Sequence, residues 1–525
     1  MNPFSRSRFL LAFVATLLFA GAAWAEAIFS VNEPGSGAYV FDQPSVAAKG
    51  TFLHVAFIGD NTASGRYKLY YAGIDGSANF QSATTTRLQV VKIRPVAIDS
   101  GDPYTDARHP QIAYRSSTST STSLVVLFQA IPAGGSDYKL FRALLVIDNN
   151  AVRTQQVKEI VHPVAGPMAG NLVDPSFGLV TTDNTLRVAY TYSATGDVYY
   201  ARAGADNAFL VGSPILLSRQ PGTRGVNPLP RLRLDSSKRS HVAWAANNTS
   251  PTPSGIYYAM VKDSSTSVDN LVIGATQVLW GGYRWGFPSI LFVSNVNRIV
   301  VLAADEPYGT TGIAGSLGFT VLHPDAVKQD GNPVDVNNLA TNSLFFITPP
   351  GGAVLFPNFD TYRPEAAIDS QNRVNVAGYG FLGSSPLYQG TPGRYYSMGI
   401  FGVTYTTGTS STFAAMILSP VPVGIGDLSF ATEIPGDYTR PAFAHFNGKA
   451  VQFWSGPDAL PPGARNLYVT GTPDAFDSSA SSQSGCAVAG NPPRGEPERI
   501  PGAVALFLPA ALIGFRKLAR KAFAR

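Results

Sequence analysis

Charged and aromatic residues stand at, or shortly before, prolines that recur along the chain, and together they could bind an anion. Four of these positions are arginines: Arg108, Arg284, Arg363 and Arg440. A planar guanidinium group grips a carboxylate in bidentate fashion, so converging arginines would form a clamp for an anionic ligand. Tyrosines and carboxylates near the same prolines complete the candidate ligand-binding set: Tyr362, Tyr438, Asp42, Asp174 and Glu365.

Each of these prolines opens a repeated unit of short, alternating apolar segments. The opening residues are Pro44, Pro110, Pro175, Pro230, Pro288, Pro364 and Pro441, spaced 55 to 77 residues apart. In the clearest unit a turn at Asp235 leads into His241-Val242-Ala243-Trp244 and then Ile256-Tyr257-Tyr258-Ala259. One such sheet cannot bury both faces alone, so repetition predicts an all-β, seven-bladed β-propeller of four-stranded antiparallel blades over residues 26–470.

The repeat also predicts how the ring closes and where a ligand would bind. The last unit ends near Thr470 with three strands, while Ile28-Phe29-Ser30-Val31 has no partner of its own, so this N-terminal strand should complete the last blade. Propellers bind ligands in a funnel lined by the loops that lead into the innermost strands. His54, His241 and Arg187 share one second-strand position, which indicates a role in the scaffold.

Two of the proline units carry a resemblance to a known family. Tyr362-Arg363-Pro364 and Arg440-Pro441 resemble the arginine-proline opening of a blade in sialidases and related BNR-type propellers. The resemblance implies that three arginines clamp a sialate carboxylate, and that Tyr438 or Tyr362 with Glu365 could serve as a nucleophile pair. The Asp-box motif of sialidases, Ser-x-Asp-x-Gly-x-x-Trp, does not occur in the chain. We therefore assign no catalytic residue from sequence.

The N-terminus predicts export. Residues 1–25 combine Arg6 and Arg8, an apolar run from Phe9 to Ala20, and small residues that suit cleavage after Ala25. The chain has one cysteine, so the exported body cannot use an intramolecular disulfide and must be held by its core.

The C-terminus has three parts. Residues 471–499 form a Ser/Gly/Pro-rich linker with Cys486, residues 500–515 an apolar segment predicted to be a short transmembrane helix, and residues 516–525 a basic cytoplasmic end. These parts resemble the MYXO-CTERM and JDVT-CTERM sorting tails of bacterial envelope proteins. The resemblance implies processing or lipid attachment at Cys486 by a sorting protease. A plain single-pass anchor with an incidental cysteine is the alternative.

Charge and motifs narrow the function classes. The formal charge of +5 includes the basic termini and does not indicate nucleic-acid binding. There is no His-Glu-x-x-His, phosphate-binding glycine loop or Gly-x-Ser-x-Gly elbow. The segment Asp330 to Asn337 lacks the closing glutamate of a calcium loop, so we expect no metal and no cofactor.

The leading hypothesis is an exported, envelope-tethered propeller that binds a glycan, protein or other anionic ligand through its funnel. Its other partners would be signal peptidase, a sorting protease and the membrane, with the body at the outer surface or in the periplasm. One alternative is a sialidase-like or other polysaccharide-active enzyme with an arginine clamp, although the sequence favours binding over catalysis. Another is a structural component of an envelope assembly.

Overall fold

The computed structural model describes most of the repeat-bearing part of the chain. The described residues are 29–31, 40–60, 65–75, 91–98, 103–118, 120–160, 170–204, 214–219, 224–225, 228–246, 255–262, 271–279, 285–294, 297–305, 317–322, 345–347, 360–368, 374–382, 395–405, 411–416, 441–457 and 465–473. Their regular structure is all β, as predicted. Within these residues no helix is long and apolar enough to cross a membrane. The predicted signal peptide, linker, apolar segment and basic end lie outside them.

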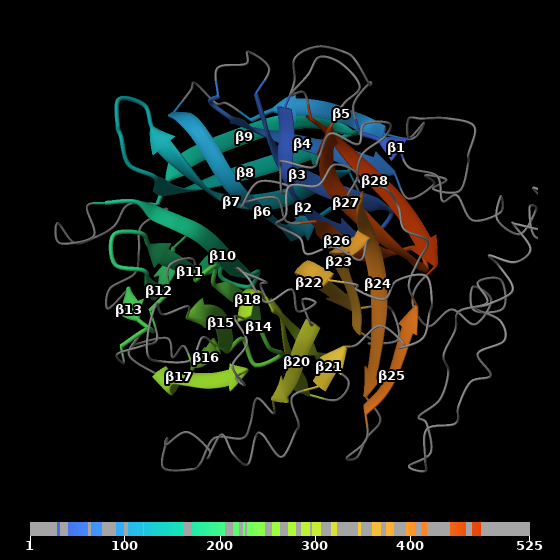
Figure 1. Cartoon of the computed structure of the whole chain (residues 1–525). Coiled ribbons are helices and arrows are strands. Elements are labelled where there is room, and N and C mark those ends of the chain that lie inside the picture. Colours follow the sequence, from blue (N-terminus) through green and yellow to red (C-terminus); the bar gives the residue numbers. More distant parts are fainter. Residues whose placement is uncertain are drawn as a thin grey trace, which may run out of the picture.

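Five sheets are separate four-stranded antiparallel blades arranged around a common centre (Figure 1). The first contains β6 (Tyr104–Ser117), β7 (Ser121–Pro132), β8 (Lys139–Asp148) and β9 (Ala151–Glu159). The second contains β10 (Leu172–Val180), β11 (Thr185–Tyr192), β12 (Asp197–Ala203) and β13 (Ile215–Leu216). The third contains β14 (Arg231–Leu234), β15 (Ser240–Ala246), β16 (Gly255–Val261) and β17 (Leu271–Leu279). The fourth contains β18 (Trp285–Val293), β19 (Arg298–Asp305), β20 (Leu317–Leu322) and β21 (Phe345–Ile347). The fifth contains β22 (Asp360–Ile368), β23 (Val374–Leu382), β24 (Tyr395–Tyr405) and β25 (Ser411–Met416).

The first and last sequence units together form one sheet of eight strands. Its members are β1 (Phe29–Ser30), β2 (Val40–Lys49), β3 (Phe52–Asp60), β4 (Lys68–Asp75), β5 (Val91–Ala97), β26 (Ala442–Phe446), β27 (Lys449–Pro457) and β28 (Arg465–Pro473). A parallel pairing of Val40 with Arg465 joins β2 to β28. The prediction of seven separate blades was therefore wrong for the described structure, which has five blades and this larger sheet. The propeller class and the four-stranded antiparallel blade are confirmed.

The N-terminal strand lies where the sequence predicts. β1 is antiparallel to β28, with Phe29 opposite Val469 and Ser30 opposite Tyr468. The amide of Val31 donates a 2.7 Å hydrogen bond to the carbonyl of Leu467, and the Val31 side chain is buried. Figure 1 shows the blue β1 beside the orange-red β28. The two ends of the repeat region are thus held together by main-chain hydrogen bonds.

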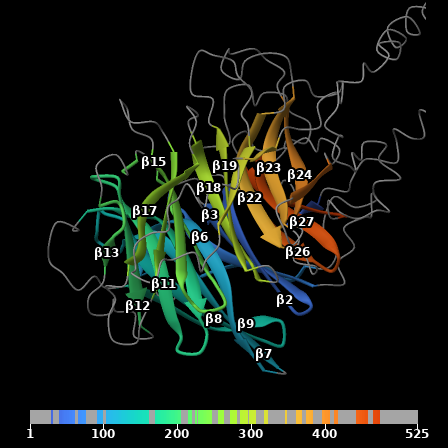
Figure 2. The same cartoon turned by 90° about the horizontal axis from the view of Figure 1, so that it is seen from below.

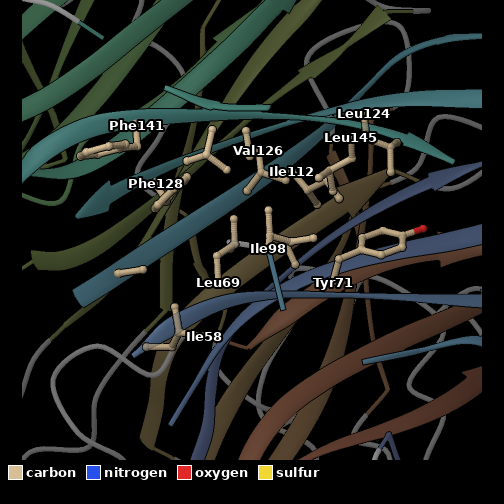
Figure 3. Packing of buried hydrophobic residues seen from close by; sticks show 14 of the residues in the cluster. Ile58, Leu69, Tyr71, Ile98, Ile112, Leu124, Val126, Phe128, Phe141 and Leu145 are labelled. Atoms are coloured by element: carbon tan, nitrogen blue, oxygen red, sulfur yellow. The ribbon is translucent and has the colours of Figure 1, made fainter. Parts of the chain in front are cut away.

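The core consists of the interfaces between neighbouring sheets. Side chains alternate across a strand, so β7 sends Leu124, Val126 and Phe128 toward β3 and β4, and Val125 and Leu127 toward β10 and β11. Figure 3 shows the first of these interfaces, where Ile58, Leu69 and Tyr71 meet residues of β6, β7 and β8. Each blade is therefore buried on both faces by its neighbours, which is the reason a single unit would not be stable alone.

The first strand of each unit faces the centre. Contacts link these strands in chain order, from β2 through β6, β10, β14, β18 and β22 to β26, and β26 contacts β2. Figure 1 shows them around the middle of the molecule, with β5, β9, β13, β17 and β25 at the periphery. Figure 2 shows the same sheets from below, standing side by side around the centre.

A β-bulge interrupts the inner strands at the proline itself. The pairing register shifts between Asp42 and Ser45, and the equivalent shift recurs in β6, β10, β18 and β22. The residue before the proline has a positive φ in five units, namely Gln43 (53°), His109 (50°), Asp174 (54°), Leu229 (45°) and Phe287 (48°). Non-glycine residues rarely adopt this conformation, and bulges re-aim side chains beside functional sites. The repeated proline therefore marks a repeated kink that faces the centre.

We predict that the contact between β1 and β28 stabilises the whole ring. Replacing the buried Val31 with alanine should cost about 1–3 kcal/mol of unfolding free energy, and deleting residues 26–32 should cost more because β28 then also loses its pairing with β1. Denaturant and thermal unfolding measure both effects. Val96→Ala, at an exposed position of β5, is the control and should change little. An unchanged melting temperature after the deletion would refute the closure.

Candidate functional site

The inner strands enclose a cavity of about 370 Å³ at the centre of the sheets. Its lining comes from β2, β6, β10, β18, β22 and β26 together with the segment 229–234 around β14, and in each case includes or adjoins the bulge. The lining combines prolines with polar and charged side chains. The polar and charged members used below are Gln43, Ser45, His109, Gln111, Asp174, Ser176, Arg231, Arg233 and Glu365. We refer to this cavity as the central channel.

Side chains that follow the proline tie each inner strand to the next. The hydroxyl of Ser45 accepts a 3.1 Å hydrogen bond from the amide of Ile112, and the Ser176 hydroxyl accepts one of 2.9 Å from the amide of Leu232. Between them, the side-chain oxygen of Gln111 accepts a 3.4 Å bond from the amide of Phe177. These bonds give amides of the inner strands an acceptor from the preceding unit. We call them the inter-blade staples.

A second set of contacts joins the residues before the prolines. The side-chain oxygen of Gln43 accepts a 2.7 Å hydrogen bond from the amide of His109. The Nδ1 atom of His109 lies 2.8 Å from Oδ1 of Asp174, and both side chains are mostly buried. The amide of Asp174 in turn donates to Oε1 of Gln129. The left-handed backbone at each of these positions is thus held by a neighbour across the blade boundary or on the adjacent strand.

Arg231 breaks the pattern of the staples. It follows Pro230, where the corresponding residues of three preceding units are Ser45, Gln111 and Ser176. A guanidinium group has donors and no acceptor, so Arg231 cannot receive an amide from the next blade. Its Nε atom is buried without a hydrogen-bond partner, and its Nη2 lies 3.7 Å from Oε2 of Glu365, which comes from β22 beyond the intervening β18. A charged group therefore stands where the scaffold elsewhere uses a small acceptor.

Arg233 brings a second guanidinium to the same region. Its Nε donates a 3.2 Å hydrogen bond to the carbonyl of Ile290 on β18, which links β14 to the next blade by a different route. The residue is solvent-accessible, although it stands within the ring of sheets.

Some of the ligand-binding residues predicted from sequence line the central channel, and others do not. Asp174 and Glu365 line the central channel. Asp42 is buried, and its carboxylate accepts a 2.7 Å bond from the amide of Gln43, which holds the bulge. Tyr362 and Arg363 belong to β22, whose register shift follows Tyr362. Four predicted ligand or processing positions and the predicted cleavage position lie outside the described residues: Arg284, Tyr438, Arg440, Cys486 and Ala25.

Arg108 belongs to a different cluster from the channel lining. Its Nε lies 3.2 Å from Oδ2 of Asp106, and its guanidinium lies over the ring of Tyr67 at 3.9 Å from the centroid. Asp106 also accepts hydrogen bonds from the Tyr67 amide and the Tyr138 hydroxyl. The carboxylate of Asp106 and the hydrogen bond to it raise the pKa of Arg108 despite burial, which acts the other way. Convergence of Arg108 with the other predicted arginines stays a prediction.

The candidate set from sequence did not include Arg231, Arg233 or His109, although His109 precedes Pro110 and Arg231 follows Pro230 directly. The residues after the seven prolines read Ser45, Gln111, Ser176, Arg231, Ser289, Glu365 and Ala442. Two charged residues interrupt this mostly small and neutral series, and they are the pair that meets across the channel. Of this pair only Glu365 was predicted, and a comparison of the residues after the prolines across all units would have added Arg231.

The two second-strand histidines lie in the blades and bond to tyrosines of the third strand. His54 Nδ1 is 2.8 Å from the Tyr71 hydroxyl, and His241 Nδ1 is 2.6 Å from the Tyr258 hydroxyl. His241 Nε2 also lies 3.1 Å from Oδ2 of Asp235 in the preceding turn. These contacts support the interpretation of both histidines as scaffold residues. Among the described residues, no group of three or more His, Cys, Asp or Glu side chains is placed to hold a metal ion.

The fold and the channel define this protein as a β-propeller with a polar centre. Neither a protein-family model nor a curated protein matches the chain. Several solved structures match the chain at low identity. A thermostable family-43 glycoside hydrolase is 10% identical with a TM-score of 0.34, covering 74% of this chain and 98% of its own. The endo-arabinase from Bacteroides thetaiotaomicron is 12% identical with a TM-score of 0.31, covering 58% and 99%.

A third likeness is to the α-L-arabinofuranosidase Arb93a from Fusarium graminearum in complex with an iminosugar inhibitor. It is 10% identical with a TM-score of 0.40, and the match covers 72% of this chain and 97% of that one. At these values the similarities carry no conclusion about activity or substrate. The functional argument therefore depends on the channel itself.

We predict that the staples contribute measurably to stability. Ser176→Ala should cost about 1–3 kcal/mol of unfolding free energy, because the buried amide of Leu232 would lose its acceptor. Ser117→Ala, at an exposed position in β6, is the matched control and should have little effect. Denaturant unfolding compares the two. Equal stability of both variants would contradict a structural role for the staple.

We also predict acid sensitivity from His54. Burial lowers the pKa of His54 from 6.5 to about 4, so the folded protein favours the neutral ring more than the unfolded chain does. Its contribution to stability is therefore complete above about pH 6.5 and is lost as the pH falls toward 4, by an amount on the order of 3 kcal/mol. His54→Gln, which can still bond to Tyr71, should flatten this part of the curve of unfolding free energy against pH. Parallel curves for both proteins would show that His54 does not carry the effect.

Proposed function

We propose that the protein binds a polar ligand in its central channel. The observation that carries this proposal is Arg231: it occupies a staple position that it cannot serve, and it leaves a buried Nε atom without a partner. A residue that departs from the bonding pattern of the three preceding units is expected where it is kept for binding. A ligand acceptor at Arg231 would satisfy the donor, and the side chain is 19% exposed, which leaves it accessible to such a group.

The channel favours a small ligand or the end of a chain. Small-molecule sites commonly have volumes of about 300–1,000 Å³, and the 370 Å³ cavity lies near the lower end of that range. Its wall combines proline edges with guanidinium, imidazole, carboxylate and amide groups, a mixture that suits the faces and hydroxyls of a sugar. A glycan end fits this lining better than a flat protein surface does.

The cellular location of the protein is proposed from its sequence. An N-terminal signal peptide cleaved after Ala25 would export the propeller, and a C-terminal sorting tail processed or lipidated at Cys486 would retain it at the bacterial envelope. Signal peptidase, a sorting protease and the membrane would be its other partners. A structural role in an envelope assembly is compatible with the same setting and does not require the channel.

We also infer that the eight-stranded sheet represents two blades. The first strands of the seven units contact one another in a closed order, and the pairing between β2 and β28 is confined to Val40 with Arg465 in the described residues. On this interpretation the ring has seven blades, and β1 is the fourth strand of the last.

A polysaccharide-active enzyme is the second candidate. The specific observation in its favour is that two carboxylates, those of Asp174 and Glu365, line the same channel, because glycoside hydrolysis uses a pair of carboxyl groups. Turnover of fluorogenic glycosides by the wild type, lost in Asp174→Asn and Glu365→Gln, would support it. No turnover across a broad panel would count against it.

We predict that a ligand of the channel depends on Arg231. A screen of the full chain against glycans and organic acids should yield a ligand whose affinity falls about tenfold or more in Arg231→Gln, because a charged donor is lost. Arg219→Gln removes an exposed arginine on another blade and should leave the affinity unchanged. Calorimetry gives the dissociation constants. A ligand that binds both variants equally well does not use the channel, and the proposal would fail.

A further inference from the structure

The channel carries an excess of positive charge where β14 faces β22. Arg231 and Arg233 are two residues apart in β14, so their side chains leave the same face of the strand. Glu365 is the carboxylate near them, and it lies 3.7 Å from Arg231. The other channel-lining carboxylate of the described residues, Asp174, is paired with His109 at 2.8 Å. Two guanidinium groups thus share one carboxylate.

Glu365 is a loose partner for these arginines. Direct hydrogen bonds between a guanidinium and a carboxylate are about 2.7–2.9 Å long, so a separation of 3.7 Å gives electrostatic attraction without such a bond. The Nε atom of Arg231 also remains without an acceptor, although it is buried. An incoming anion that reached Arg231 directly would gain hydrogen bonds that Glu365 does not make.

A hydrogen bond anchors Arg233 beside the same part of the channel. This bond runs from its Nε to the Ile290 carbonyl and does not use the donors of its two terminal nitrogens. Arg231 and Arg233 carry like charges two residues apart on one face of β14, so each adds to the electrostatic cost of the other. An anion between or beside the two guanidinium groups would relieve this repulsion.

We propose that Arg231 and Arg233 form a seat for a carboxylate or phosphate group of the ligand, and that this group displaces Glu365 from Arg231. The proposal rests on the proposed function, since it concerns the ligand of the same channel. It assigns anion recognition to a pair on one inner strand, distinct from the predicted set of Arg108, Arg284, Arg363 and Arg440. Glu365 then acts as an internal competitor that disfavours ligands without a negative charge.

The test compares matched ligands that differ in charge. Calorimetry on the full chain would use glucose, glucuronate and glucose 6-phosphate, which share a ring and differ in the group at one end. We expect at least one of the two anions to bind about tenfold more tightly than glucose, in line with the strength of charge-assisted hydrogen bonds. The tighter of the two identifies the anion as carboxylate or phosphate.

Substitutions separate the seat from general binding. Arg231→Gln and Arg233→Gln should reduce the preference for the anion over glucose, whereas Glu365→Gln should strengthen anion binding because it removes the competitor. Arg219→Gln is the control and should leave the preference unchanged. Where Arg233→Gln unfolds the protein, Arg233→Lys keeps the charge and tests the geometry, with a smaller loss expected. Melting temperatures of all variants show whether each is folded.

Three results would overturn the seat. Equal binding of glucose and both anions would remove the charge preference while leaving a channel ligand, and therefore the proposed function, intact. A Glu365→Gln variant that binds the anion more weakly than the wild type would make Glu365 a ligand contact, contrary to the proposal. Failure of both anions to bind would also overturn the seat, and the screen described above would then decide the proposed function separately.

Discussion

The structure depends on the hydrogen bonds by which the side chain after one proline accepts the backbone amide of the next blade. Apart from the single pairing of Val40 with Arg465, each inner strand is paired along one edge only, so amides on its other edge need acceptors from elsewhere, and a buried donor without an acceptor costs about 1–3 kcal/mol. Ser45, Gln111 and Ser176 supply such acceptors for three successive boundaries. These residues also line the channel, so the contacts that hold the ring together also build its central site.

This arrangement gives Arg231 its functional meaning. The three preceding units have a neutral acceptor after the proline, whereas Arg231 offers donors alone. The boundary is connected instead by Arg233, through the carbonyl of Ile290. Arg231 is thereby released from the scaffold and meets Glu365 across the channel. A structural position has been used for a charged group, at the expense of a buried Nε without a partner.

Much of the architecture could be predicted from sequence, because strand period and turn spacing are local properties that recur. The pairing of β1 with β28 followed from counting strands in the last unit, and the histidines could be assigned to the scaffold because Arg187 fills the same place. The union of two units into one sheet could not be predicted, because it depends on the approach of Val40 to Arg465 in space. For the site, Asp174 and Glu365 were predicted and do line the channel. Arg231 follows its proline as Glu365 does but was not selected, because its departure from Ser45, Gln111 and Ser176 has meaning only once the hydrogen bonds of those residues across the blade boundaries are known.

The central claim is that the channel is a ligand site organised by Arg231. The most direct measurement is a crystal structure of the protein with glucuronate or glucose 6-phosphate bound. The account predicts ligand density in the channel, with anion oxygens at hydrogen-bonding distance from Arg231 and Arg233 and with Glu365 moved away from Arg231. A channel that holds water alone, with the ligand at the Arg108 cluster or elsewhere on the surface, would contradict it.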